Sequence, residues 1–352
     1  MLTKVSGSRK NPTDGTIGRV ETDGGKFIIR AMIRLSIIAI GLIAALAGGP
    51  ATAFDKFLAL GTSSSGGVYW PVGQSICKFI NASRIEHLVR CLAYNTGGSV
   101  YNIQALSSGE LDVAITRADL AYQAYRGEGL FSALGANKGL RTITNLYGQP
   151  VAVIVKKGSG IISFDHFDGR KINIGNLGSG KRDIADHIFK IMGWSNERFD
   201  TVTEYTSSKT ADAFCKGEID IVIESLGIPA KFYDRITKEC GGVFLSLPAR
   251  LIAGFKKSGP FFYDDVIPGD VYPNNPADVK TVGIKIVLMT LARVDKTSIG
   301  IVSKAIHEDL AKFTATHPAL ARSNRKTMIE DGIHVPLHDG ARDYYRTEKG
   351  AE

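Results

Sequence analysis

The sequence predicts an α/β protein built from two similar lobes, and two internal echoes carry this prediction. An apolar run at residues 58–61 leads into a TSSSGG loop, and 114 residues later the run at 172–175 leads into NLGSG. The segment ALSSGELDVAI at 105–115 then matches AFCKGEIDIVI at 213–223, at an offset of 108. Short apolar strands that alternate with helices are typical of a mainly parallel sheet covered by helices on both faces. Two such lobes with helix N-termini at the gap between them would form a clamp for a small anion.

Residues 1–53 form a predicted leader with a signal peptide. Its apolar run covers residues 35–47, after a positive start at 32–34, and Ala51-Thr52-Ala53 has the small-x-small pattern of a cleavage site. A membrane span needs about 20 apolar residues, so this pattern favours a cleaved signal peptide over an anchor. We therefore expect an exported, periplasmic protein that begins at Phe54, with Met1 or Met32 as the start of translation.

The charge balance argues against nucleic acid as a partner. The chain has 43 Lys and Arg and 35 Asp and Glu, a net charge of +8, and the leader holds seven of the basic and three of the acidic residues. The remainder thus carries +4, which is too mild and too evenly spread for a nucleic-acid-binding protein. A weak positive field still attracts small anions.

Four cysteines follow the leader as two local pairs, Cys77 with Cys91 and Cys215 with Cys240. Four cysteines allow three disulfide connectivities. We predict the two local bridges, because each closes a short loop within one repeat and an exported chain meets oxidising conditions. Zinc is the alternative, but the sequence has no CxxC and no histidine at ligand spacing. No metal or other cofactor is expected.

The elements of the first lobe follow from local signals. Strands are predicted at 56–61, 88–94 and 111–115, and helices at 69–80 and 99–108. Ser99 is the predicted N-cap of the second helix, and Gly109 the left-handed residue after its end. An apolar, β-branched strand at 150–156 then leads out of the lobe.

The second lobe repeats this order. Its strands are predicted at 171–175, 201–205, 219–224 and 243–247, and its helices at 181–192 and 210–216. An irregular connection at 261–276, a strand at 282–291, an amphipathic helix at 296–316 and a peripheral end from Pro336 complete the chain. Crossovers at 151–156 and 247–255 are the hinge candidates. The predicted domains are the leader, lobe 1 at 54–152 plus 254–352, and lobe 2 at 153–253.

The loop GNLGSGKR at 175–182 nearly matches the phosphate-binding pattern GxxxxGK[ST]. Arg182 replaces the hydroxyl that would hold Mg²⁺, so a nucleotide site is not predicted. Glycines at a helix N-terminus nevertheless expose backbone N–H groups, which bind carboxylate as readily as phosphate. Two such loops in register, with a third at 96–99, favour ligand binding over plain strand-to-helix turns.

No catalytic constellation is visible. The sequence lacks GxSxG and HExxH, and Pro336 separates His334 from His338. A secreted hydrolase is therefore the less favoured alternative. Arg117 and Glu224 lie just beyond the two repeated strands, at the sheet edge where ligands bind. Arg117 would hold a ligand carboxylate and Glu224 would accept from an ammonium or hydroxyl group; alternatively they pair with each other or cap helices.

Seven short motifs occur in order after the leader: GTSSSGGVYWP at 61–71, TGGSV at 96–100, GELD at 109–112, GSG at 178–180, GEID at 217–220, GIP at 227–229 and IPGDVYP at 267–273. This ordered set resembles the TAXI solute-binding proteins, the extracytoplasmic receptors of one branch of TRAP transporters. The resemblance implies a type II periplasmic-binding-protein fold, with two α/β lobes joined by a hinge around a ligand cleft. It also implies a receptor, not an enzyme, that delivers a small organic acid or amino acid to an ion-gradient-driven permease. A receptor for an ABC importer is the neighbouring alternative.

The motif positions imply a set of ligand contacts, and Arg117, Lys181 and Glu224 join it as charged candidates. The set is Gly66, Gly67, Tyr69, Thr96, Gly98, Ser99, Arg117, Ser179, Gly180, Lys181, Glu224, Gly227 and Tyr272. Three positions depart from the family pattern. Lys181 stands where a small hydroxyl residue is usual, Ile228 where histidine is usual, and Thr116-Arg117 where a Val-Gln type pair is usual. The two added positive charges favour a dianionic ligand.

Overall fold

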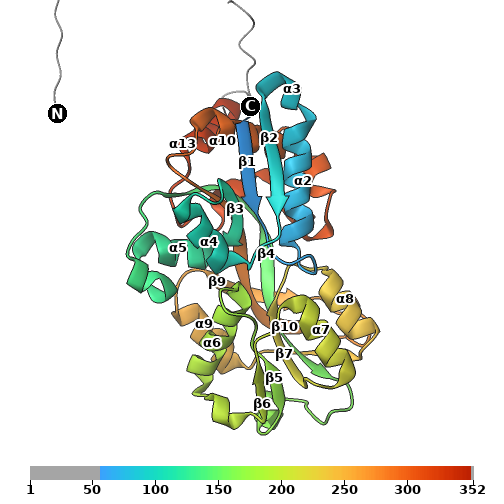
Figure 1. The fold of residues 1–352 in the computed structure, drawn as a ribbon. Coiled ribbons are helices and arrows are strands. Elements are labelled where there is room, and N and C mark those ends of the chain that lie inside the picture. The colour runs from blue at the N-terminus through green and yellow to red at the C-terminus, as the bar shows by residue number, and fades with distance from the viewer. Residues whose placement is uncertain (1–55, 350–352) are drawn as a thin grey trace, which may run out of the picture. The chain divides into compact units, whose positions relative to one another are not determined.

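The computed structural model describes residues 56–349 (Figure 1). The predicted leader, its signal peptide and the cleavage site after Ala53 lie outside these residues. Among the described helices, none combines the length and the apolar character needed to cross a bilayer.

The first repeated unit is a parallel β-α-β-α-β arrangement. It consists of β1 (Lys56–Gly61), α2 (Tyr69–Ala82), α3 (Arg84–His87), β2 (Val89–Tyr94), α4 (Ser99–Ser108), β3 (Val113–Arg117) and α5 (Ala118–Arg126). Strand β1 lies between β2 and β3 and is parallel to both. In Figure 1 this unit occupies the upper part of the picture, with α2 and α4 beside its strands.

The second unit has the same strand order. It consists of β5 (Lys171–Asn173), α6 (Gly180–Met192), β6 (Thr201–Thr203), α7 (Ser207–Lys216), β7 (Ile221–Ser225), α8 (Lys231–Lys238), β8 (Gly242–Leu245) and α9 (Ala249–Lys257). Strand β5 lies between β6 and β7 and is parallel to both. This unit forms the lower part of Figure 1.

The repeated sequence segments have the same local structure. Gly109 and Gly217 end α4 and α7 in the left-handed region, with φ of +86° and +77°. Asp112 then accepts from the backbone N–H of Ala59 in β1 (2.9 Å), and Asp220 accepts from that of Lys171 in β5 (3.0 Å). Each aspartate ties the third strand of its unit to the first, which explains why the GE-x-D pattern occurs twice.

Two long antiparallel strands connect the units, β4 (Leu140–Lys156) and β10 (Val279–Leu291). The sheet order is β2-β1-β3-β10-β4-β7-β5-β6, with β8 on β4 and β9 (Phe262–Ile267) on β10. The first part of β4 pairs with β10, and its end at residues 151–155 pairs with β7. One continuous strand thus passes from one lobe to the other.

The remaining elements complete the lobes. They are α10 (Lys296–His307), α11 (Leu310–Thr314), α12 (Arg325–Glu330) and α13 (Asp339–Lys349), with short 3₁₀ turns at Gly129–Leu134, Phe164–Phe167, Asn196–Arg198 and Pro318–Leu320. Both predicted disulfides are present. Cys77–Cys91 joins α2 to β2, and Cys215–Cys240 joins α7 to the segment after α8, with Cα–Cα distances of 4.9 and 4.8 Å.

Several predicted elements were wrong. The segment predicted to be irregular contains β9, in which buried Phe262 and Ile267 enclose the exposed Asp264 and Val266. The single helix at 296–316 is two helices, because Asp309 caps α11 by accepting from the backbone N–H of Lys312 (3.0 Å). The end from Pro336 is not peripheral: Tyr345 of α13 is buried and donates to the carbonyl of Ile143 (2.9 Å).

The predicted second hinge also differs. Residues 247–255 lead into and form most of α9, and Leu251 and Phe255 pack in one apolar cluster with Ile184 and Ile188 of α6. The segment therefore belongs to the core of the second unit, and the long return strand is β10. The lobe boundaries at 152/153 and 253/254 stay a prediction.

Candidate functional site

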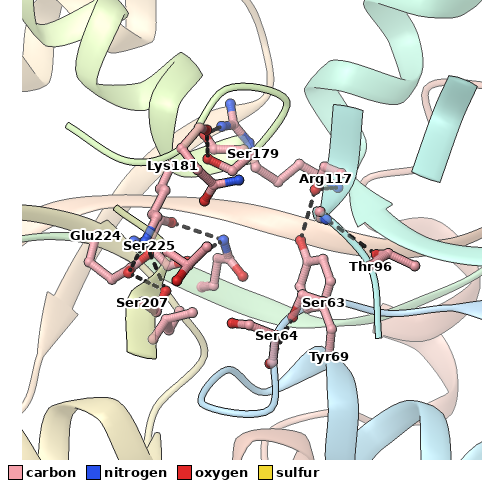
Figure 2. A pocket seen from close by; sticks show the side chains of 18 residues that line it. Ser63, Ser64, Tyr69, Thr96, Arg117, Ser179, Lys181, Ser207, Glu224 and Ser225 are labelled. Atoms are coloured by element: carbon pink, nitrogen blue, oxygen red, sulfur yellow. Dashed lines mark hydrogen bonds and ion pairs between the residues drawn. The ribbon is translucent and has the colours of Figure 1, made fainter. Parts of the chain in front are cut away.

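A cavity of about 90 Å³ lies where loops of both units meet (Figure 2). Four helices begin at its wall. Tyr69, Ser99, Gly180 and Ser207 are the first residues of α2, α4, α6 and α7, and all four line the cavity. The first N–H groups of a helix have no partner within the helix and carry partial positive charge. The cavity is therefore built to receive an acceptor or an anion.

The loops before these helices explain this convergence. Gly98 is the N-cap of α4 with φ of +98°, a conformation that favours glycine. Ser179 caps α6 by accepting from the backbone N–H of Arg182 (3.2 Å). The predicted N-cap, Ser99, is instead the first helical residue. Its Oγ accepts from the N–H of Arg117 and lies 3.2 Å from the hydroxyl of Tyr69, so it connects three parts of the wall.

Tyr69 keeps its proton in this setting. Burial raises the pKa of its hydroxyl above the ordinary value, although the hydrogen bond with Ser99 opposes the shift. A protonated phenol at the cavity wall has a hydrogen to donate.

Arg117, the last residue of β3, is only 1% exposed and is held by protein groups. Its Nε donates to Asp119 Oδ1 (3.0 Å), and its Nη2 donates to Asp119 and to Asp183 Oδ2 (2.8 Å). Its Nη1 donates to the carbonyl of Gly180. Burial opposes the charge, but the two carboxylates outweigh burial and hold the pKa of the guanidinium above its ordinary value. Since Asp183 and Gly180 belong to α6, Arg117 bridges the two units.

Lys181 lies in a second buried cluster, on the other side of the cavity in Figure 2. Its Nζ donates to Ser207 Oγ (2.9 Å) and to Glu224 Oε2 (3.1 Å). Ser207 also donates to Glu224 Oε2 (2.7 Å), and Glu224 Oε1 accepts from the N–H of Ser225 (3.1 Å). Lys181, Ser207 and Glu224 therefore serve as hydrogen-bond partners for one another.

These contacts overturn one expectation from the sequence. Arg117 and Glu224 do not pair with each other, and each has a different charged partner. Arg117, which was expected to hold a ligand carboxylate, is paired with Asp119 and Asp183, and Glu224 neutralises Lys181. The two added cations leave no unpaired positive charge, so the argument for a dianionic ligand no longer holds.

The structure brings together nine of the predicted ligand residues. Those that line the cavity are Tyr69, Thr96, Gly98, Ser99, Arg117, Ser179, Gly180, Lys181 and Glu224. Gly66, Gly67, Gly227 and Tyr272 do not line it. Tyr272 is a core residue, packed against Tyr233 and Phe244, and its hydroxyl accepts from the N–H of Ala230 (3.0 Å). Ligand contact by any of these residues stays a prediction.

Seven polar residues of the wall were not among the predicted ligand contacts: Ser63, Ser64, Gln149, Asn176, Thr206, Ser207 and Ser225. The offset of 108 between the repeats maps Ser99 onto Ser207 and Arg117 onto Ser225, so the repeat contained the signal for two of them. Gln149 lies in β4, directly before the apolar run that was predicted as a strand. A polar residue next to such a run gives no indication that it faces a cavity.

The cavity wall has no histidine and no cluster of metal ligands in the described part of the chain. Within residues 56–349, no group of three or more His, Cys, Asp or Glu side chains is placed to hold a metal ion. None of the residues that line the cavity is histidine.

The two-lobed α/β architecture, with helix N-termini from both units at one cavity, is that of periplasmic substrate-binding proteins. Residues 60–350 match the NMT1-like family, and the chain belongs to this family. MatC from Rhodopseudomonas palustris, solved with bound malate, has a similar structure: 10% identity, TM-score 0.54, coverage of 86% of this chain and 100% of MatC. The periplasmic binding protein BugD gives 11% identity and a TM-score of 0.52, over 84% of this chain and 97% of BugD. These likenesses confirm the predicted fold.

Proposed function

We propose that the protein is a periplasmic solute receptor, not an enzyme. It binds a small organic acid or amino acid by its carboxylate and delivers this ligand to a TRAP-type permease that runs on an ion gradient. The observation that carries the proposal is the convergence of four helix N-termini, two from each unit, on one small cavity. A ligand held by both units stabilises the closed arrangement of the lobes.

The charges of the wall favour a ligand with a single carboxylate at this point. Arg117 and Lys181 are paired with protein carboxylates, so the free attraction for an anion comes from the helix ends. Each helix N-terminus contributes about 0.3–1 kcal/mol at an exposed site and up to about 2 kcal/mol when partly buried. Several such helix ends that act together in one small cavity can bind one carboxylate.

Two further features support the transport role. The ordered loop motifs resemble those of TAXI receptors over nearly all of the chain after the leader. Two disulfides are typical of a protein that works in an oxidising compartment. The permease type is tested by co-purification: a TRAP membrane subunit, rather than an ATPase, is the expected partner.

A thermal-shift screen of the chain from Phe54 onward tests the binding function. The panel holds monocarboxylates, dicarboxylates, amino acids and sugars at 1 mM. Stabilisation grows as RT ln(1 + [L]/Kd), so a ligand with a micromolar Kd adds about 4 kcal/mol. We expect the strongest shift from a carboxylate. No shift from any carboxylate, or an equal shift from sugars, contradicts the proposal.

Two neighbouring serines provide a matched pair of variants. Ser64 lines the cavity, whereas Ser65 is exposed and does not. We expect Ser64→Trp to fill part of the cavity and abolish the carboxylate shift, while Ser65→Trp keeps it. If both variants respond like the wild type, the ligand binds elsewhere.

A further inference from the structure

Gln149 of β4 has an unused hydrogen-bond acceptor at this cavity. Its side chain is 3% exposed and lines the cavity. Its Nε2 donates to the carbonyl oxygen of Ser225 (3.0 Å) and to Ser225 Oγ (2.9 Å). Its Oε1 has no hydrogen-bond partner within the described residues.

The orientation of this amide follows from its neighbour. The carbonyl oxygen of Ser225 only accepts, so the amide nitrogen must face it. Ser225 Oγ donates its hydrogen to the carbonyl of Pro150 (3.1 Å) and therefore also accepts from Gln149. A flipped amide would place an oxygen against two acceptors. Oε1 is therefore fixed on the side of the amide that faces away from Ser225.

The other functional side chains of the wall do not have this property. Arg117, Lys181 and Glu224 all have partners in the protein. Among the buried side-chain atoms that lack a partner in the described part of the chain, Gln149 Oε1 is the one whose residue lines this cavity. A buried acceptor without a donor costs about 1–3 kcal/mol, so a ligand that supplies the donor gains that amount relative to one that does not.

The position of Gln149 also limits where the donor lies on the ligand. Gln149 contacts Ser225, the N–H of Ser225 bonds Glu224, and Glu224 bonds Ser207 at the start of α7. Gln149 and the first residues of the four helices also line one cavity of only about 90 Å³, so a donor that reaches Oε1 lies in the same small space as the carboxylate. The donor therefore belongs on a carbon close to the carboxylate.

We propose that Gln149 is a specificity-determining residue, and that it selects carboxylates with a hydroxyl or ammonium group near the carboxylate. The preferred ligand is then a hydroxy acid or an amino acid. Unsubstituted acids leave Oε1 without a donor, and keto acids place a second acceptor against it. This inference rests on the proposed carboxylate-binding function.

Titration calorimetry on matched ligand pairs tests the inference. The pairs are lactate with pyruvate, malate with succinate, and 2-hydroxyglutarate with 2-oxoglutarate. For the pair that binds, we expect the hydroxy acid to bind about 5- to 150-fold more tightly, the range set by one buried unpaired acceptor. Gln149→Leu should reduce this ratio to near one. Ser65→Ala, at an exposed residue that does not line the cavity, should keep it.

The outcomes separate the inference from the function on which it rests. If neither member of any pair binds, and amino acids do not bind either, the proposed function fails. If the acids bind but each pair binds equally, the function stands and the role of Gln149 is overturned, with Oε1 served by water. The wild-type ratios decide this even if Gln149→Leu does not fold.

Discussion

The bridge between Arg117 and Asp183 leads to a sharp prediction about lobe closure. Arg117 ends β3 of the first unit, and Asp183 lies in α6 of the second; Nη2 and Oδ2 are 2.8 Å apart, and the side chains are 1% and 14% exposed. Asp183→Ala removes this carboxylate but leaves Arg117 paired with Asp119. The change therefore weakens a contact between the lobes without leaving a buried charge unpaired.

The size of the effect follows from the bond that is lost. A hydrogen bond to a charged group contributes about 1.5–3 kcal/mol net, which shifts the ratio of closed to open protein about 10- to 150-fold. Once the open state dominates, the apparent Kd rises by the same factor, because the ligand must select a rarer closed state. Small-angle scattering of the ligand-free protein measures the shift toward the open state. Titration calorimetry with a carboxylate that binds measures the rise in Kd.

Asp186 supplies a matched control on the same helix. Its side chain is 52% exposed and pairs with Arg182 at the surface. Asp186→Ala should leave both scattering and affinity unchanged. If Asp183→Ala also leaves the radius of gyration and the Kd unchanged, the bridge does not hold the lobes together and the reasoning is refuted.

Three further predictions concern stability, each measured by urea unfolding. Burial lowers the pKa of His307 to about 4. Between pH 6.5 and 4 the unfolded state therefore binds a proton at this residue that the folded state does not bind. The free energy of unfolding should fall by up to about 3 kcal/mol over this range. His307→Leu should flatten this slope, and an unchanged slope contradicts the assignment. Lys181→Met leaves Glu224 buried without its cation and should lower the free energy of unfolding by about 3–5 kcal/mol. Adding Glu224→Gln should restore most of this loss. If Lys181→Met alone is as stable as the wild type, the pairing is refuted. Removing the Cys77–Cys91 bridge, whose cysteines are 14 residues apart, should cost about 3 kcal/mol, and a cost below about 1 kcal/mol contradicts the loop-entropy argument.

The sequence was most informative where the chain repeats itself. Gly109 and Gly217 end helices in the same conformation, and Asp112 and Asp220 make the same bond to the first strand of their unit. Such local geometry depends on few residues, so similar segments adopt similar structures. The loops that begin α4 and α6 were identified for the same reason. Glycine and serine favour a strand-to-helix turn through their own backbone conformation and side chain, so a short segment is enough to predict it.

The partners of the charged residues could not be predicted from the sequence. Arg117 is held by Asp119, two positions away, but also by Asp183, 66 positions away. No periodicity relates β3 to α6, and only the fold brings them together. Strand β4 was predicted at less than half its length, because Gln149 and other polar residues interrupt its apolar pattern. Those polar residues face a cavity or bond other segments, which only the tertiary structure reveals.

The central claim is that the helix ends of both units hold a carboxylate in this cavity. Its most direct test is a structure determined with the strongest carboxylate from the screen. We expect a carboxylate group within hydrogen-bond distance of backbone N–H groups at the starts of helices from both units, with Arg117 still bound to Asp119 and Asp183. A ligand found outside the cavity, or one that displaces Asp119 from Arg117 and takes the guanidinium for itself, would contradict it.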